Sequence, residues 1–414
     1  MTPPPAGLAP RDATPVPWRV QAAVYGAGLF SNSSLQLYNV IVPLWVLVLA
    51  PSPFVVGIVL ASRQFLPMLL SIHGGALMDR FGVRRVMLGF AAMAIVIPLF
   101  YPLLPFIPAV VVLQMLSGLA VMLCWVGVQS MIGQIMQGHP VYTGRLTLST
   151  RIGVFVGPPL AGAMWDLGGP WAAFGFLTLW ATGAFVCTLL VPAPEADRVA
   201  EEGARAPTPP KIGLRDLLPN PRDYVAAFSL LGIPAIAMVI GATMLRHSGV
   251  GMQSSFYIVY LGQIGISGTA IGTLISVTGI FGALGSLFVG RLARLVAPRL
   301  LLLVGVAIGT TMIMITPLLG AYVLLLIAQS LRGLCSGIAS SMEISLMARS
   351  AGATSQGKGA ALRLTMGRTV AVIVPVVMGA VVELAGLENS FYIVGGAILA
   401  LLLWVALKGG RTAA

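Results

Sequence analysis

Three arginines lie deep inside otherwise uncharged stretches of this sequence, at Arg63, Arg246 and Arg332. His247 directly follows the second of them. A charged side chain is costly in apolar surroundings and is normally kept for function. Because a guanidinium group binds a carboxylate or phosphate through paired hydrogen bonds, these residues predict a site for an organic anion, or for a zwitterion with an acidic group. In the alternative, Arg63 and Arg332 pair with helix carbonyls or with Glu343, which leaves an apolar pocket suited to hydrophobic compounds.

Neutral polar side chains recur at helical spacing in two of the uncharged stretches. One stripe consists of Arg246, Gln253, Tyr257 and Tyr260, and the other of Asn32, Gln36 and Asn39. Such stripes either line a cavity or make hydrogen bonds between helices. The predicted binding residues are Arg63, Arg246, His247, Arg332, Gln253, Tyr257, Asn32, Gln36 and Asn39.

Few groups in these stretches can change their charge near neutral pH. His247 carries the side chain type that titrates between about pH 5 and 8, and Glu343 is an acid on the same predicted helix as Arg332. We therefore predict that any proton coupling uses His247 and Glu343. For Glu343 there is a structural alternative, an ion pair with Arg349 or Arg363.

The chain that must position these groups has 414 residues, of which 57% are hydrophobic and only 9% are charged. Soluble domains carry about 25% charged residues, so a water-soluble globule is excluded. Uncharged runs of about 20 residues, the length of a helix that crosses the hydrocarbon layer, recur along the whole chain. The sequence predicts an all-α membrane protein with twelve transmembrane helices.

A polar stretch divides the apolar sequence into two parts of similar size. The predicted organisation is a disordered cytoplasmic tail at 1–17, a six-helix bundle at 18–191, a cytoplasmic linker at 192–223, a second six-helix bundle at 224–407 and a cytoplasmic tail at 408–414. Arginine and lysine lie in the loops of one side, whereas the loops of the other contain acids such as Asp166, Glu383 and Glu388. Since positive loops stay inside, both termini are predicted to be cytoplasmic.

The two parts also resemble each other in sequence. A shift of 215 residues aligns Gly57 with Gly272 and Gly118 with Gly333, and a shift of 217 aligns Arg151 with Arg368 and Asp166 with Glu383. Because six helices return the chain to its starting side, the two halves share one orientation, with a repeat axis along the membrane normal. A cavity is then expected between the halves, near the middle of the membrane.

A charged turn joins the second and third predicted helices. Its glycines allow a close helix approach and a tight turn, and Asp79 can meet an arginine or the positive end of a helix. A turn of this kind can hold the two halves together on one side. The predicted gating residues are Gly75, Asp79, Arg80, Gly82, Arg84 and Arg85.

This turn resembles the loop between helices 2 and 3 of the major facilitator superfamily, which reads G-x-L-x-D-R-x-G-R-[RK], and it departs from that pattern at Val83. The fifth predicted helix resembles the G-x-x-x-G-P-x-x-G-G signature of the superfamily's proton-coupled exporters, with Ala161 in place of one glycine. The alternative is a packing motif unrelated to transport direction. The residues that carry the second likeness are Gly153, Gly157, Pro158 and Gly162.

The resemblance implies the major facilitator fold and transport by alternating access, with no cofactor and no metal. Arg332 and Gly333 also match an Arg-Gly signature that many family members carry on the fourth helix, where this chain has Ser117 and Gly118. We therefore place any proton coupling in the second half. The leading expectation is a proton-coupled exporter of a small anionic or zwitterionic molecule. It would act as a monomer in the lipid bilayer of a bacterial inner membrane.

The alternatives within transport are an importer or facilitator of a small organic acid and an exporter of hydrophobic drugs, with a lipid flippase ranked below them. An enzyme is not expected, because His73, His139 and His247 are scattered and the sequence has neither metal-ligand spacing nor a phosphate-binding glycine loop. The net charge is +12, and most of the charged residues lie in the predicted loops and tails, so nucleic acid is not an expected partner.

Overall fold

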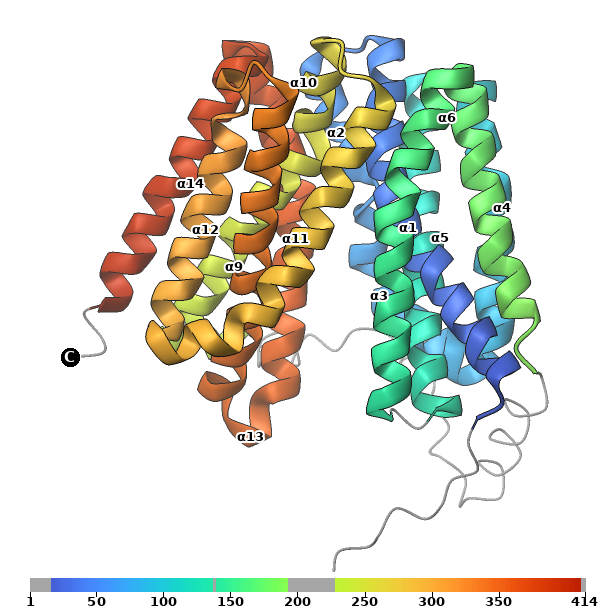
Figure 1. Ribbon diagram of the computed structural model, residues 1–414, viewed down its shortest axis with the longest axis horizontal. Helices are drawn as coiled ribbons and strands as arrows, with labels where there is room; N and C mark the ends of the chain where they lie inside the picture. The colour runs from blue at the N-terminus through green and yellow to red at the C-terminus, as the bar shows by residue number, and fades with distance from the viewer. Residues whose placement is uncertain (1–15, 137–138, 193–227, 411–414) are drawn as a thin grey trace, which may run out of the picture.

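The structure is a computed structural model that describes residues 16–136, 139–192 and 228–410, and these contain helices but no strand. Two groups of helices stand side by side (Figure 1). The first group contains α1 (Trp18–Leu49), α2 (Pro53–Ser62), α3 (Phe65–Phe81), α4 (Val83–Leu103), α5 (Ile107–Ile135) and α6 (Pro140–Leu189). The second contains η1 (Ser229–Gly232), α9 (Pro234–Met252), the π-helix η2 (Gln253–Tyr257), α10 (Ile258–Gln263), α11 (Gly268–Leu295), α12 (Pro298–Met314), η3 (Thr316–Leu318), α13 (Tyr322–Ala385) and α14 (Leu387–Gly410).

Ten helical segments of the described residues are long and apolar enough to cross a membrane, and α12 is a shorter apolar helix. Two of the long helices change direction. In α6 the backbone leaves helical geometry at Gly168 and Gly169, and Gly169 has a φ of 62°, which glycine adopts without strain. In α13 two apolar segments, Tyr322–Met347 and Leu362–Ala385, are joined by a reversal of the chain that Figure 1 shows beside its label.

The two ends of the bundle are distinct. We call the end where α1 begins and α14 stops the tail end, and the end where α1 passes into α2 and α10 passes into α11 the distal end (Figure 1). The predicted tails and linker fall mainly outside the described residues, at 1–15, 193–223 and 411–414.

Close contacts between helix backbones join the two groups, with α2 against α13 and α6 against α11. Glycine makes this approach possible, because it has no Cβ atom. A Cβ atom added at Gly57, Gly162, Gly272 or Gly379 would collide with the backbone oxygen of Pro375, Gly268, Pro158 or Pro53, respectively. These four contacts form two pairs whose members are offset by 215 or 217 positions in the sequence.

The largest cluster of buried apolar side chains belongs to both groups. It includes Trp45 of α1, Tyr257 of η2 and Met378 of α13. A second cluster, with Val24 and Leu123, lies within the first group alone. Apolar packing therefore continues from one group into the other.

Candidate functional site

A cavity of about 340 Å³ lies between the two groups of helices. It lies on the tail side of the glycine contacts, since Arg151 precedes Gly162 along α6 and Thr278 follows Gly272 along α11. Its size falls in the range of small-molecule sites, at about 300–1,000 Å³. The polar lining includes Asn39, Arg63, Arg151, His247, Gln253 and Thr278.

Arg63 reaches the cavity from a break between α2 and α3. Residue 67 is a proline, so it has no N–H group to donate to the carbonyl of Arg63 four positions earlier, and the helix is interrupted there. A Cβ atom added at Gly118 of α5 would collide with that carbonyl oxygen. The apolar run at 54–78 predicts one continuous transmembrane helix, and the structure has two, because Pro67 removes the hydrogen bond that would join them.

The guanidinium of Arg63 is held by neutral partners. Its Nη2 donates to Asn39 Oδ1 at 2.5 Å, and Asn39 Nδ2 donates to Gln36 Oε1 at 3.0 Å. Only 7% of Arg63 is exposed. Arg63, Asn39 and Gln36 all line the cavity, so one of the two predicted polar stripes reaches it with two of its three members. Asn32, the third, is half-buried and is not part of the lining.

Arg332 of α13, unlike Arg63, lies in a buried hydrogen-bond network with the side-chain amides of Gln253 and Gln329. Its guanidinium donates to Gln253 Oε1 and, at 3.0 Å, to the carbonyl oxygen of Gly249. Gln253 Nε2 donates to Gln329 Oε1 at 2.9 Å and to Thr278 Oγ1 at 3.1 Å. Arg332 is 3% exposed and is not among the residues that line the cavity, whereas Gln253 is.

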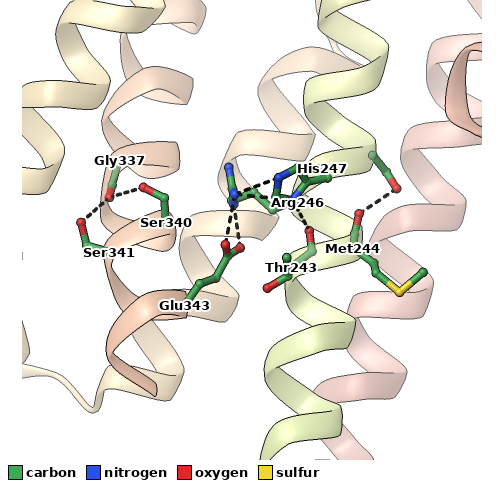
Figure 2. A network of polar contacts seen from close by, with 9 residues as sticks. Thr243, Met244, Arg246, His247, Gly337, Ser340, Ser341 and Glu343 are labelled. Carbon is green, nitrogen blue, oxygen red and sulfur yellow. Dashed lines mark hydrogen bonds and ion pairs between the residues drawn. The ribbon is translucent and has the colours of Figure 1, made fainter. Parts of the chain in front are cut away.

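Arg246 of α9 forms an ion pair with Glu343 of α13, as Figure 2 shows. Arg246 Nε donates to Glu343 Oε1 at 2.6 Å, and Nη2 donates to Oε2 at 3.0 Å. The carboxylate is fully buried, and 14% of the Arg246 side chain is exposed. The partner of Glu343 is thus Arg246 and not Arg349 or Arg363, which the sequence offered as alternatives. Arg246, a predicted substrate-binding residue, is therefore already paired with a carboxylate of the protein.

His247 connects this ion pair to the cavity that it lines. Its Nδ1 donates to the carbonyl oxygen of Thr243 at 2.8 Å, and its Nε2 lies 3.4 Å from Arg246 Nη2 (Figure 2). With a proton on Nδ1, Nε2 is left as an acceptor. Tyr257, another predicted binding residue, is fully buried, and its hydroxyl group has no hydrogen-bond partner in the described part of the chain.

Arg151 of α6 was not among the predicted binding residues. It is exposed, lines the cavity, and has no hydrogen bond or ion pair within the described residues. Its counterpart in the repeat, Arg368, donates from Nη1 to the carbonyl oxygen of Pro67 at 3.0 Å. In the sequence, the alignment of Arg151 with Arg368 is the signal that distinguishes this arginine.

The predicted gating residues lie at the turn between α3 and α4. Gly82 has a φ of 84°, which fits its role in a tight turn. Arg84 Nη2 donates to the carbonyl oxygen of Leu189 at 2.9 Å, and Arg85 is exposed. The remaining members, Gly75, Asp79 and Arg80, fall outside the residues whose side chains the structure describes.

The glycines of the predicted fifth-helix signature lie in the first arm of α6 and contact two other helices. Gly153 and Gly157 pack against Leu29 and Leu37 of α1, and Gly162 packs against Gly268 of α11. The carbonyl of Pro158 contacts Gly272 of α11. The motif therefore serves close packing both within the first group and between the groups.

A model of the major facilitator superfamily matches residues 24–260 and 239–413. The chain belongs to this superfamily. It is therefore a multi-pass membrane transporter of small molecules and not an enzyme. No curated protein sequence matches the chain.

Solved structures of the superfamily resemble this chain in fold. The nucleoside transporter NupG is 15% identical, with a TM-score of 0.70 over 94% of this chain and 98% of its own. A D-xylose-proton symporter is 14% identical, with a TM-score of 0.67 over 94% and 97%. A POT family transporter in complex with a thioalcohol-conjugated peptide is 14% identical, with a TM-score of 0.69 over 95% and 96%. At such identities, the likeness extends to the fold alone.

Proposed function

We propose that this superfamily member crosses the membrane twelve times, as two six-helix halves that work by alternating access. Counting each arm of α6 separately and adding the shorter α12 to the ten long segments gives twelve crossings. The glycine contacts between α2 and α13 and between α6 and α11, offset by 215 or 217 positions, support a repeat. The tail end then faces the cytoplasm of a bacterial cell, and the distal end faces outward.

The substrate that the cavity fits best is a small molecule with an anionic group. The observation that carries this conclusion is the charge of the lining, which contains Arg63, Arg151 and His247 but no carboxylate among the described residues. Arg151 has no partner among the described residues, so a carboxylate or phosphate on the substrate would satisfy it. The hydroxyl and amide groups of the lining suit a polar substrate better than a hydrophobic drug, and a zwitterion fits as well.

Coupling to protons is assigned to His247, Arg246 and Glu343. Protonation of His247 at Nε2 would turn an acceptor that faces Arg246 into a donor and place two positive charges together. The contact between His247 and Arg246 would then open, and Arg246 would depend on Glu343 alone. The likeness of the α6 glycines to the exporter signature favours export driven by proton entry. Import or facilitated movement of an organic acid is the second candidate, because the same lining would serve it.

A thermal-shift screen of the purified protein tests the substrate class. Carboxylic acids, phosphate esters and amino acids would be compared with sugars, nucleosides and lipophilic cations, since a ligand of the folded state raises the melting temperature. We expect acidic compounds to raise it, and Arg151→Gln to weaken their binding about tenfold, the effect of losing one charge-assisted hydrogen bond. Arg291→Gln, a change of another exposed arginine outside the cavity lining, is the control.

Stabilisation by neutral compounds alone, or acid binding equal in Arg151→Gln and the parent, would overturn the anion assignment. Direction and coupling are then measured in proteoliposomes with the compounds that bind. Export requires that an inward proton gradient drives the acid out against its own concentration gradient. A facilitator would only equilibrate the acid across the membrane, with no effect of the proton gradient.

A further inference from the structure

Asp166 lies where the first arm of α6 ends, at the distal end, and it contacts the other half of the molecule. Its carboxylate accepts hydrogen bonds from the backbone N–H groups of Gly268 and Thr269 at 2.7 and 2.8 Å, and from Thr269 Oγ1 at 2.6 Å. These N–H groups begin α11, so they have no partner within their own helix. The carboxylate also faces the positive end of the α11 dipole.

Glu383 makes the corresponding contact in the opposite direction. It lies near the end of α13, and its Oε2 accepts a hydrogen bond from the backbone N–H of Phe54 at 3.2 Å, in the first turn of α2. Asp166 and Glu383 are 217 positions apart, and Phe54 and Thr269 are 215 apart. Each half therefore places a carboxylate on a helix N-terminus of the other half.

Both contacts depend on the groups being in close approach. Gly162, four residues before Asp166, packs against the backbone of Gly268, and Gly379, four residues before Glu383, packs against the backbone of Pro53. Since both acceptors and donors lie on different groups of helices, the hydrogen bonds exist only while the distal backbones touch. The cavity lies on the tail side of these contacts.

We propose that Asp166 and Glu383 form a two-point latch that holds the distal end of the transport path closed, and that both carboxylates leave their helix N-termini when that end opens. This inference rests on alternating access as proposed above, but not on the nature of the substrate. Asp166 accepts three hydrogen bonds and Glu383 accepts one. Asp166 is therefore the stronger point, and Glu383 releases first.

The latch is tested by distance measurements between spin labels on the full-length protein in lipid nanodiscs. Cys124, Cys187 and Cys335 are first replaced, because they are free thiols. A label pair at Phe106→Cys and Leu318→Cys reports the distal end, where these side chains are 53% and 69% exposed in the two halves. A pair at Leu148→Cys and Leu295→Cys, 64% and 84% exposed, reports the tail end.

In the double variant Asp166→Asn with Glu383→Gln, we expect a new population with a longer distal distance and a shorter tail distance. Loss of charge-assisted hydrogen bonds on this scale should raise the ratio of distal-open to distal-closed molecules about tenfold or more. Asp166→Asn alone should exceed Glu383→Gln alone. Glu388→Gln is the matched control. It removes an acid from the same end, in the first turn of α14, where Glu388 makes no hydrogen bond or ion pair within the described residues.

Distal distances in the double variant that coincide with those of the parent would overturn the latch. So would an equal shift in Glu388→Gln, since it would trace the effect to net charge. If the double variant does not fold, Thr269→Ala, which removes only the hydroxyl donor, must still shift the distal population towards opening. Opening in the double variant without any binding of acids would keep the latch and contradict the proposed substrate class, so the two failures are distinguishable.

Discussion

The two halves each bury one arginine among amide groups, but they place it on different helices. In the first half it is Arg63, at the break between α2 and α3, and in the second it is Arg332 of α13. The repeat puts Thr278 opposite Arg63 and Ser117 opposite Arg332. Among the described residues, each half thus buries one guanidinium group, but at positions that the repeat does not relate.

The halves differ in what their charges can reach. Arg63 lines the cavity, whereas Arg332 is covered by Gln253. The second half adds the ion pair of Arg246 and Glu343, next to a histidine. The halves therefore differ in exposure of charge: the first places Arg63 and Arg151 at the cavity, whereas the second holds Arg246 in an ion pair and Arg332 among neutral partners.

The largest effect is expected from Glu343→Gln. The change leaves Arg246 without its counter-charge, and breaking a buried pair costs about 3–5 kcal/mol. Thermal unfolding in detergent should show a lower melting temperature, and Arg246→Gln combined with Glu343→Gln should recover part of it. Glu388→Gln serves as the control. An unchanged melting temperature in Glu343→Gln would mean that the second half does not rely on its internal pair.

Close helix contacts should be equally sensitive in both halves. A Cβ atom added at Gly118 would strike the carbonyl oxygen of Arg63, and one added at Gly333 would strike that of Thr278. Gly118→Ala and Gly333→Ala should each destabilise the protein by about 1–3 kcal/mol, measured by the same unfolding assay. Gly133→Ala lies on the same helix as Gly118 but in open space, so it is the control. A marked loss of stability in only one of the two variants would show that the contacts at Gly118 and Gly333 are not equivalent.

The two buried arginines should separate in a binding titration. Arg63→Gln should weaken the binding of an acidic ligand about tenfold, since it removes a charge-assisted contact from the cavity. Arg332→Gln should lower the melting temperature with little change in affinity, because Arg332 does not line the cavity. Isothermal titration with the acid that binds best measures both. Weaker binding in Arg332→Gln, with unchanged binding in Arg63→Gln, would contradict the role given to each arginine.

The smallest effect is expected from His247→Gln, which should keep binding and flatten the pH profile of transport between about pH 5 and 8. Initial rates in proteoliposomes at several pH values, with equal pH on both sides, measure it. Gln253→Asn, a change of a neutral residue of the same lining, should alter the rate at all pH values alike. A pH profile that His247→Gln leaves intact would remove the histidine from the coupling step.

Much of the architecture could be predicted from the sequence, because hydropathy and glycine spacing act locally. The turn at Gly82 and the glycines of α6 indicate the superfamily by residue type and spacing alone. The break at Arg63 was also within reach, since Pro67 follows it by four residues. Hydropathy alone does not show the break, because the residues on both sides of it are apolar.

The site was harder to predict, because its partners are distant in sequence. Arg246 and Glu343 are 97 positions apart, and no local spacing connects them. Arg151 lies near the end of a predicted span, where an arginine is ordinarily solvated, so its place in the sequence does not indicate a binding role. Its place in the cavity follows from the packing of α6 against α11, which brings together residues more than 100 positions apart in the sequence.

The π-helical turn at Gln253–Tyr257 has a mechanical consequence. It inserts extra backbone between α9, which bears the ion pair, and α10, which borders the distal end. Such turns are frequent at functional sites, and slipping one residue back to α-helical winding would rotate α10 by about 100° relative to α9. A change of winding by one residue beside Gln253 would therefore rotate α10 at the distal end while the segment stays helical.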